Sequence, residues 1–195
     1  MGMTRIIAGS ARGRKIAVPA EGTRPTSDRA REGLFSALNA RLEFPGARVL
    51  DLFAGSGALG LEAASRGADR VVLVDASQDA CEIIRGNAAV LSDVDAQIDV
   101  VAAPALDYVA RTGERFDLVL ADPPYAVGND ELAELLDQLP RVLKPDAMVV
   151  IEREVRSAEA PWPEGFVPTT QKLKRRTYGK ARMDMANYRG TENDG

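Results

Sequence analysis

From residue 48 onward, short apolar runs alternate with longer segments in which apolar residues recur at helical spacing. The runs predict strands over residues 48–53, 70–74, 98–101, 116–121 and 148–151. The segments between them predict helices that begin near Gly57, Gln78, Pro104 and Asn129. Such alternation is typical of a parallel sheet with helices on its faces. The pattern therefore predicts an α/β fold.

Two of these helices carry further information. The last has a leucine stripe that predicts a buried face, made of Leu132, Leu135, Leu136, Leu139 and Leu143. In the helix that begins near Gln78, Asn87 falls within the apolar face. Because a buried amide needs hydrogen-bond partners, we expect Asn87 to brace a neighbouring loop. Direct contact between Asn87 and a ligand is the alternative.

Both ends of the chain predict structure outside this alternation. Residues 4–8 and 14–18 read as two short strands around a glycine-containing turn, which predicts a small basic hairpin. Thr26, Ser27 and Asp28 can each cap a helix that precedes the sheet. Residues 166–173 and 182–188 predict a terminal hairpin, with Tyr178 and Gly179 at its turn. The expected divisions are a hairpin and loop over 1–25, the main domain over 26–190 and a flexible tail over 191–195.

Composition narrows the chemistry that the chain can perform. Its 195 residues, 45% of them hydrophobic, suit a single globular domain. It has no histidine and one cysteine, Cys81, which excludes the usual zinc-ligand sets and the histidine-dependent nucleophile pairs. We therefore expect no metal, and a reaction that uses carboxylates, backbone groups or a cofactor. No apolar run reaches the roughly 18 residues of a membrane span and no signal-peptide pattern follows Met1, so the expected location is the cytoplasm, away from membranes.

Charge is distributed unevenly, although the net charge is only −4. Residues 1–31 carry seven basic and two acidic side chains, residues 172–189 carry seven and one, and the middle of the chain is acidic. Two basic ends predict that one face of the molecule meets a polyanion, the alternative being solvated charge at loosely packed termini. The candidate nucleic-acid contacts near the N-terminus are Arg5, Arg12, Arg14, Lys15, Arg24 and Arg29.

A glycine-rich turn points to a nucleoside-containing cofactor. The segment from Asp51 to Gly60 follows a buried strand, opens a helix and fits the pattern Gly-x-Gly-x-x-Gly, with Gly55 and Gly57 as its first two glycines. Asp75 ends the next strand, where a carboxylate can accept both hydroxyls of a ribose. NAD and S-adenosylmethionine both fit this arrangement. Asp51 favours S-adenosylmethionine, because a carboxylate there attracts the methionine ammonium and would repel a pyrophosphate.

The fourth predicted strand ends in Asp122-Pro123-Pro124-Tyr125, a stiff turn at the edge where open parallel sheets bind ligands. An exocyclic amine on a nucleobase is a poor nucleophile, because its lone pair is delocalised into the ring. The Asp122 carboxylate and the Pro123 carbonyl can accept its two N–H bonds and let the nitrogen pyramidalise. Tyr125 can stack on the extruded base. These residues predict amine methylation; methylation at carbon 5 of a pyrimidine usually needs a cysteine, and Cys81 lies in a predicted helix away from this turn.

With these residues placed, the sequence resembles the bacterial RsmD-type methyltransferases, which modify the N2 amine of a guanine in 16S ribosomal RNA. The resemblance covers almost the whole chain. Its most specific parts are Arg5 to Gly9 with Gly13 to Lys15, Arg24 to Glu32, Asp51 to Ala63, Ser65 to Ala68, and Asp122 to Tyr125. The first two segments lie outside the general methyltransferase core, so they narrow the match to this family.

The resemblance implies a class I S-adenosylmethionine-dependent methyltransferase fold: a Rossmann-like, seven-stranded mixed sheet whose last strand is antiparallel, with the small N-terminal hairpin as an extension. It implies that the cofactor is held by the loop that starts at Arg24 and by Asp51, Phe53, Gly55, Gly57 and Asp75. It also implies that the substrate is the small ribosomal subunit or an assembly intermediate, gripped partly by the hairpin.

Some alternatives stay open at this point. Relatives often place a polar residue after the third strand to reach the adenine amine, and this chain has Ala102-Ala103-Pro104-Ala105 there, so that contact is backbone or absent. The main rival function is a DNA methyltransferase that acts on adenine N6 or on cytosine, since the Asp122 turn recognises an amine rather than one base. An NAD-dependent oxidoreductase and a noncatalytic RNA-binding protein are more distant rivals. The expected assembly is a monomer.

Overall fold

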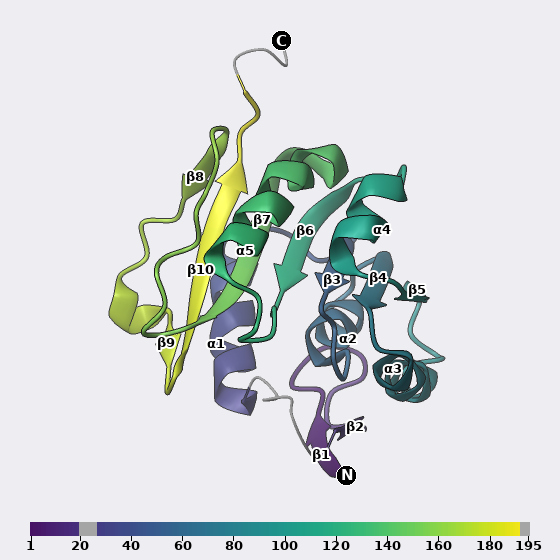
Figure 1. Ribbon diagram of the computed structural model, residues 1–195. Coiled ribbons are helices and arrows are strands. Elements are labelled where there is room, and N and C mark those ends of the chain that lie inside the picture. Colours follow the sequence, from purple (N-terminus) through teal and green to yellow (C-terminus); the bar gives the residue numbers. More distant parts are fainter. Residues whose placement is uncertain (20–26, 192–195) are drawn as a thin grey trace.

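The computed structural model describes residues 1–19 and 27–191, and within them a central sheet lies between two layers of helices (Figure 1). The sheet contains β3 (Arg48–Leu52), β4 (Arg70–Asp75), β5 (Gln97–Ala102), β6 (Phe116–Ala121), β7 (Leu143–Glu154), β8 (Phe166–Pro168), β9 (Thr177–Tyr178) and β10 (Ala181–Tyr188). A separate hairpin pairs β1 (Gly2–Arg5) with β2 (Lys15–Val18). The helices are α1 (Asp28–Asn39), α2 (Ala58–Ser65), α3 (Gln78–Val90), α4 (Ala105–Arg111) and α5 (Asn129–Gln138), with short 3-10 turns η1 (Leu139–Val142) and η2 (Leu173–Arg175).

The strand order is β5-β4-β3-β6-β7-β10-β8, with the two-residue β9 paired to β10 beside this path. Strands β3 to β7 run parallel to one another, and β10 runs antiparallel to both β7 and β8. The mixed sheet with an antiparallel strand at the end of the chain is confirmed, and β9 adds one short strand to the seven expected.

Several predicted boundaries were wrong. The first hairpin strand ends at Arg5 rather than reaching residue 8, because the amides of Ile7 and Ala8 donate to Glu62 instead of to the facing strand. Strand β7 is far longer than 148–151, since its second half pairs with β10. Strand β8 ends at Pro168 instead of Leu173, so the tight turn of the C-terminal region joins β9 to β10. The helix before the sheet begins as expected, with the Ser27 side chain accepting the Ala30 amide at 3.1 Å.

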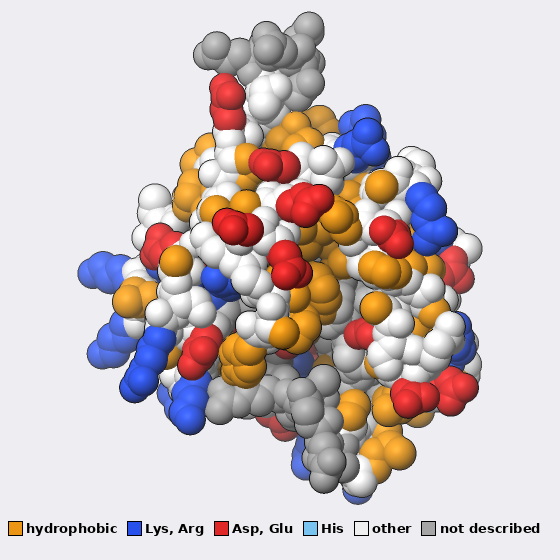
Figure 2. Space-filling model, in the orientation of Figure 1, with side chains coloured by type: hydrophobic (Ala, Val, Ile, Leu, Met, Phe, Trp, Pro, Cys, Tyr) orange, Lys and Arg blue, Asp and Glu red, His pale blue; other side chains and the backbone are white. Residues whose placement is uncertain are grey.

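The sheet is buried on both faces, because alternate residues of each parallel strand point to opposite sides. Helices α1, α2 and α3 cover one face with the hairpin, and α4 and α5 cover the other (Figure 1). The leucine stripe predicted for α5 and the residues after it is buried, as expected. Figure 2 shows the opposite side of α5 as a surface with several acidic side chains; exposed acids on this helix are Asp130, Glu131, Glu134 and Asp137.

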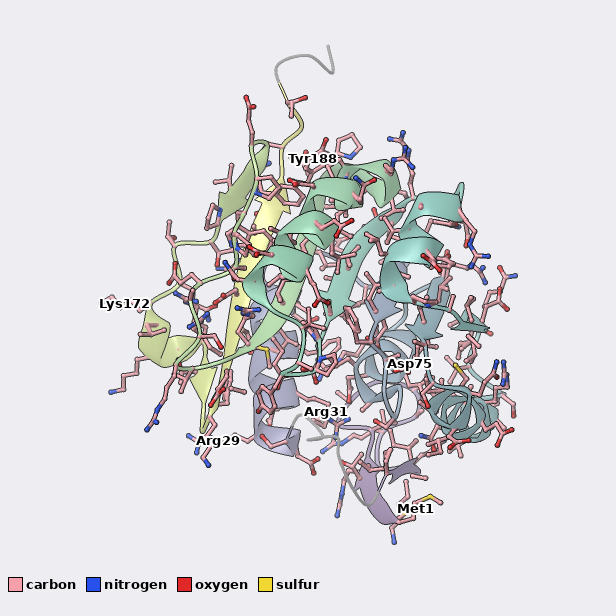
Figure 3. All side chains as sticks on the ribbon, viewed as in Figure 1. Met1, Arg29, Arg31, Asp75, Lys172 and Tyr188 are labelled. Atoms are coloured by element: carbon pink, nitrogen blue, oxygen red, sulfur yellow. The ribbon has the colours of Figure 1, made fainter. Side chains whose placement is uncertain are left out.

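All the parallel strands end at one edge of the sheet, and the hairpin lies at this edge too. Figure 3 labels Asp75 at the end of β4, Arg29 at the start of α1 and Met1 at the start of the hairpin, all on this side of the molecule. No helix within residues 1–19 and 27–191 has the length and apolar character needed to cross a membrane.

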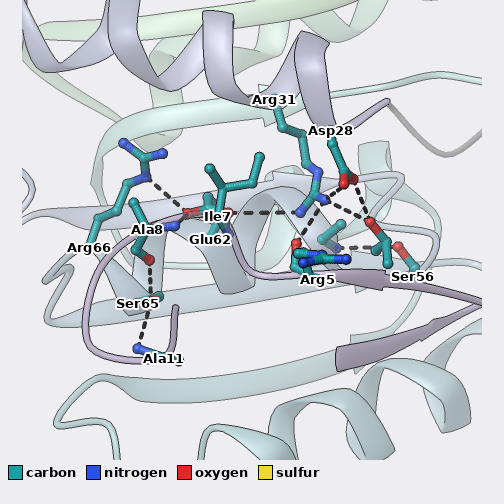
Figure 4. Close-up of polar contacts among 12 residues, drawn as sticks. Arg5, Ile7, Ala8, Ala11, Asp28, Arg31, Ser56, Glu62, Ser65 and Arg66 are labelled. Atoms are coloured by element: carbon teal, nitrogen blue, oxygen red, sulfur yellow. Dashed lines mark hydrogen bonds and ion pairs between the residues drawn. The ribbon is translucent and has the colours of Figure 1, made fainter. Parts of the chain in front are cut away.

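A buried carboxylate attaches the hairpin segment to α2 (Figure 4). Glu62 is fully buried, and its two oxygens accept the amides of Ile7 at 2.8 Å and Ala8 at 3.1 Å. It also accepts Arg66 Nε at 3.0 Å. These bonds draw Ile7 and Ala8 out of the hairpin ladder, which explains why β1 ends early.

Arg31 is the buried cation of the same network (Figure 4). Its Nη2 donates to the carbonyl of Arg5 at 2.9 Å, to Thr4 Oγ1 at 2.8 Å and to Asp28 Oδ1 at 2.8 Å, and its Nη1 lies 3.8 Å from Glu62 Oε1. Arg31 therefore joins α1 to the hairpin while Glu62 joins the hairpin to α2.

We expect Glu62→Ala to destabilise the protein by about 3–5 kcal/mol, because it leaves two backbone amides without their acceptor and removes one of the two carboxylates beside buried Arg31. Chemical denaturation measures the change. Glu32→Ala, an exposed position on α1, is the matched control and should alter the free energy of unfolding by less than about 0.5 kcal/mol. Equal stability of the two variants would contradict the anchoring role of Glu62.

Candidate active site

A cavity of about 1170 Å³ opens at the carboxyl edge of the sheet. Its walls come from the loops after β3, β4 and β6, the second half of β7, the start of α1, the end of β2 and the turn between β9 and β10. Every residue singled out for cofactor binding except Gly57 lines it, as do Asp122, Pro123 and Tyr125. The residues predicted to bind the cofactor and the residues predicted to bind the target amine thus line the same cavity.

The turn after β3 needs its glycines. Phe53 has φ of 55° and Gly57 has φ of 82°, and Gly57 is the N-cap of α2. A Cβ at Gly60 would lie 2.8 Å from Leu73 Cδ2 and 3.1 Å from Asp51 Oδ2, so only glycine lets α2 pack this closely on the sheet. Gly57 therefore has a conformational role at the start of α2, and it does not line the cavity.

Asp75 joins two of the loops that line the cavity. Its Oδ2 accepts the Gly55 amide at 2.9 Å and its Oδ1 accepts the Ser77 amide at 2.9 Å. A carboxylate oxygen has two lone pairs, so each can accept another hydrogen bond. Asp75 is thereby fixed where a ribose-binding carboxylate was expected, at the end of β4.

Asp51 lies in β3 at the bottom of the cavity. It is 1% exposed, and its Oδ2 accepts the amide of Gly60 at 2.9 Å. Burial raises the pKa of Asp51 to about 8, with the charge of Asp75 adding to the shift and the Gly60 bond opposing it. Because burial disfavours the ionised form of Asp51, a cationic partner would stabilise that form. This fits the expected role of Asp51 in binding an ammonium group.

The Asp122 turn follows β6 directly. Burial, the charge of the nearby Glu152, the charge of Asp51 and a hydrogen bond with Glu152 together raise the pKa of Asp122 to about 8, and burial contributes most. The Pro124 carbonyl accepts the Val127 amide at 2.9 Å, which closes the turn. Tyr125 is 65% exposed at the cavity wall, so its ring presents a large apolar surface.

Sequence reasoning missed Glu152. In the parallel pairing of β6 with β7, Ala121 is opposite Ile151, so Asp122 and Glu152 are the next neighbours along these strands. Glu152 also lines the cavity. A glutamate near the end of a predicted strand, one position after the carboxyl edge, was the signal that could have identified it.

Asn87 braces a loop, as predicted. Its Oδ1 accepts the Ala17 amide at 2.7 Å, and its Nδ2 donates to the carbonyls of Ala17 and Ser56, both at 2.8 Å. It does not line the active-site cavity, so the alternative of direct contact with a ligand there is not supported. The residue connects β2 of the hairpin to the glycine-rich turn.

The predicted nucleic-acid contacts fall into three groups. Arg29 lines the cavity, and Arg5, Arg12 and Lys15 are exposed on the hairpin. Arg14 forms a salt bridge with Asp93, and its Nη1 donates to the Val90 carbonyl at 3.0 Å. These bonds give Arg14 a structural role in holding the hairpin against α3, and its phosphate contact stays a prediction.

Three remaining expectations concern the edges of the site. Arg24, with its loop and the boundary expected at residue 25, lies outside the described residues, as does most of the expected tail, residues 192–195. Ala102 to Ala105 do not line the cavity. Cys81 is fully buried, and burial raises the pKa of its thiol; it is not a cavity residue.

The sheet order together with this site defines the class: an S-adenosylmethionine-dependent methyltransferase of the Rossmann-like type. Residues 4–187 match the family described as Conserved hypothetical protein 95, and the chain belongs to that family. This confirms the resemblance to the RsmD-type enzymes.

The chain is similar to characterised and structurally solved relatives over most of its length. It is 39% identical over 158 residues to "Ribosomal RNA small subunit methyltransferase D" of Escherichia coli strain K12, covering 80% of this chain and 77% of that protein. It is 35% identical over 191 residues to "Putative rRNA methyltransferase YlbH" of Bacillus subtilis strain 168, covering 95% of this chain and 100% of that protein. The solved structure of "Putative methyltransferase yhhF from Escherichia coli" is similar with a TM-score of 0.82 and 32% identity, over 97% of this chain and 100% of that one.

Proposed function

We propose that this protein transfers a methyl group from S-adenosylmethionine to the exocyclic N2 amine of a guanine in 16S ribosomal RNA, within the small ribosomal subunit or its assembly intermediate. The observation that carries the proposal is the common cavity shared by the Asp122 turn and the Asp51–Asp75 loops. The names of both relatives support ribosomal RNA as the substrate class, and the name of the Escherichia coli relative supports the small subunit.

The residues on the cofactor side fit S-adenosylmethionine, which supplies an electrophilic methyl group when bound. Asp51 would hold the ammonium group and Asp75 the ribose hydroxyls. A Cβ at Gly55 would meet nothing within 4 Å, so the backbone there adjoins open space that a ligand can fill. Phe53 also lines the cavity and offers an apolar wall.

On the other side of the cavity, Asp122 and the Pro123 carbonyl would accept the two N–H bonds of the target amine. Tyr125 would stack on the base, a contact worth about 1–3 kcal/mol. When the amine takes the methyl group that S-adenosylmethionine would supply, its nitrogen would release a proton, and an oxygen of Asp122 in its ionised form would accept that proton. Most of the rate acceleration then comes from positioning.

The pair of Asp122 and Glu152 supports guanine over adenine as the target. Guanine presents N1–H and N2–H₂ donors side by side on its Watson–Crick edge. When both carboxyl groups are ionised they only accept hydrogen bonds, so they match these donors, whereas the bare N1 acceptor beside the adenine amine would face a carboxylate without a hydrogen bond. The arrangement therefore favours guanine over the rival that methylates adenine N6.

The test compares methylated nucleosides after incubation of the protein and cofactor with small ribosomal subunits and with duplex DNA. The subunits come from a strain that lacks the protein, and mass spectrometry identifies the product. We expect N2-methylguanine in the RNA and no product in DNA. Methyladenine or methylcytosine in DNA alone would establish the rival function.

The hairpin cations predict salt-dependent substrate binding. We expect the double variant Arg12→Gln, Lys15→Gln to bind small subunits more weakly, with a slope of log affinity against log salt that is shallower by about 1.5. The double variant Arg111→Gln, Arg141→Gln changes the same charge at exposed positions near the opposite edge of the sheet and should leave the slope unchanged. Identical slopes for both variants would remove the hairpin from the interface.

A further inference from the structure

The second basic end of the chain includes a segment on the far side of the cavity from the hairpin. We call residues 169–180, which connect β8 to β10 and include η2 and β9, the C-terminal arm. Its exposed cations are Lys172, Lys174, Arg175 and Lys180. Figure 2 shows basic side chains gathered on this side of the molecule, where Figure 3 labels Lys172.

The structure separates the cations of this region into two kinds. Arg176 and Arg182 point inward: both bind Asp184, at 2.6 Å and 2.7 Å, and Arg176 also pairs with Glu159 at 2.8 Å. Arg176 thereby holds the arm to β10, whereas Arg182 lies in β10 itself. The four exposed cations form no salt bridge within residues 1–19 and 27–191, so the fold does not use their charge.

The arm is a fixed scaffold for these cations. The Tyr178 hydroxyl donates to the Arg175 carbonyl at 3.1 Å, and Thr177 Oγ1 donates to the Leu173 carbonyl at 2.8 Å. Tyr178 also packs against α1 at Gly33, where a Cβ would lie 2.1 Å from the Tyr178 hydroxyl. Cations on an ordered support lose less entropy on binding a phosphate than cations on a free tail.

The position of the arm relates it to the active site. Residues 177–181 line the cavity on one side, and Val18 and Pro19, which follow the basic hairpin, line it elsewhere. Arg29 also lines the cavity, and its charge acts on the Tyr178 hydroxyl of the arm. The acidic surface of α5 repels a polyanion from the adjacent face (Figure 2).

We propose that the C-terminal arm is a second phosphate-binding surface, which holds the RNA backbone on the side of the extruded base opposite the hairpin. This inference rests on the proposed function and adds to it the second part of the RNA-binding surface. Extrusion of the target base from its stack costs a few kcal/mol. Phosphate contacts on both sides of that base would hold the RNA strand in place during this step.

The test is the triple variant Lys172→Gln, Lys174→Gln, Arg175→Gln, which spares the cavity residue Lys180. We expect its KM for small ribosomal subunits to rise at least about tenfold at 0.1 M salt, and its salt slope to become shallower by about 2. Its kcat and its affinity for S-adenosylhomocysteine should match the wild type, because the arm cations touch neither the cofactor residues nor Asp122. Circular dichroism checks that the variant is folded.

The matched control is Arg111→Gln, Arg115→Gln, Arg141→Gln, which removes the same charge from exposed positions near the other edge of the sheet. Its KM and slope should equal those of the wild type. If both triple variants lose affinity equally, or neither does, the arm is not a binding surface. A wild type that binds but does not methylate small subunits would instead overturn the proposed function, and the salt slopes of binding would still decide the role of the arm.

Discussion

Asp122→Ala should lose methyl transfer by at least about 100-fold while it still binds S-adenosylhomocysteine. The carboxylate accepts an N–H of the amine and receives its proton, and alanine offers neither function. The cofactor residues Asp51 and Asp75 lie on other strands and keep their own hydrogen bonds. Single-turnover methylation of small subunits measures transfer, and calorimetric titration measures the affinity for the cofactor product. Turnover close to that of the wild type would contradict the mechanism.

Two further variants separate the role of Asp122 from a loss of structure. Asp122→Asn keeps one acceptor oxygen and should retain more activity than Asp122→Ala. Glu152→Gln removes the charge that raises the pKa of Asp122, so the rise of activity with pH should move to lower pH. A pH profile identical to that of the wild type would show that Glu152 does not act on Asp122 during the reaction.

Asp51→Asn should abolish tight cofactor binding and at the same time stabilise the protein. The folded state holds the pKa of Asp51 at about 8, whereas an unfolded carboxyl titrates near pH 4. The folded chain therefore retains a proton that the unfolded chain releases, so the stability of the wild type falls as pH rises between about 4 and about 8. Asparagine removes that penalty, which is absent below about pH 4 and reaches about 3 kcal/mol or more at pH 8.

Thermal unfolding at several pH values tests the stability change, and titration with S-adenosylhomocysteine tests binding. The wild-type affinity should increase with pH up to about 8, as Asp51 ionises to meet the ligand ammonium, and the variant should show no such increase. Asp95→Asn, at an exposed carboxylate, is the control and should change neither quantity. A melting temperature of Asp51→Asn below that of the wild type across this range would contradict the burial argument.

The parts of the site that follow from local sequence could be predicted. The turn from Asp51 to Gly60 and the rigid segment after Asp122 are short motifs at strand ends, and the parallel sheet brings strand ends together. Glu62, inside α2, could not be predicted in this way, and Glu152 was missed although it stands at the edge of a predicted strand. Each is a glutamate without a local motif, and its role comes from contacts across strands or across more than fifty residues of sequence.

In the hairpin, too, contacts with distant residues decided features that the local sequence could not predict. Its two strands follow from apolar alternation, yet β1 ends early because Glu62 accepts the amides of Ile7 and Ala8. Arg14 was grouped with the other basic residues by composition, and only the fold reveals Asp93 beside it. Charge counts identify a basic region, whereas tertiary contacts decide which cations are available to a ligand.

The amide of Asn87 holds β2 and the turn after β3 with one rigid group. If RNA binds the hairpin as proposed, a displacement of the hairpin would act through Asn87 on the loop expected to hold the cofactor. Thermodynamic reciprocity then applies: the factor by which RNA changes cofactor affinity equals the factor by which the cofactor changes RNA affinity. The order in which the two ligands arrive would leave the stability of the ternary complex unchanged.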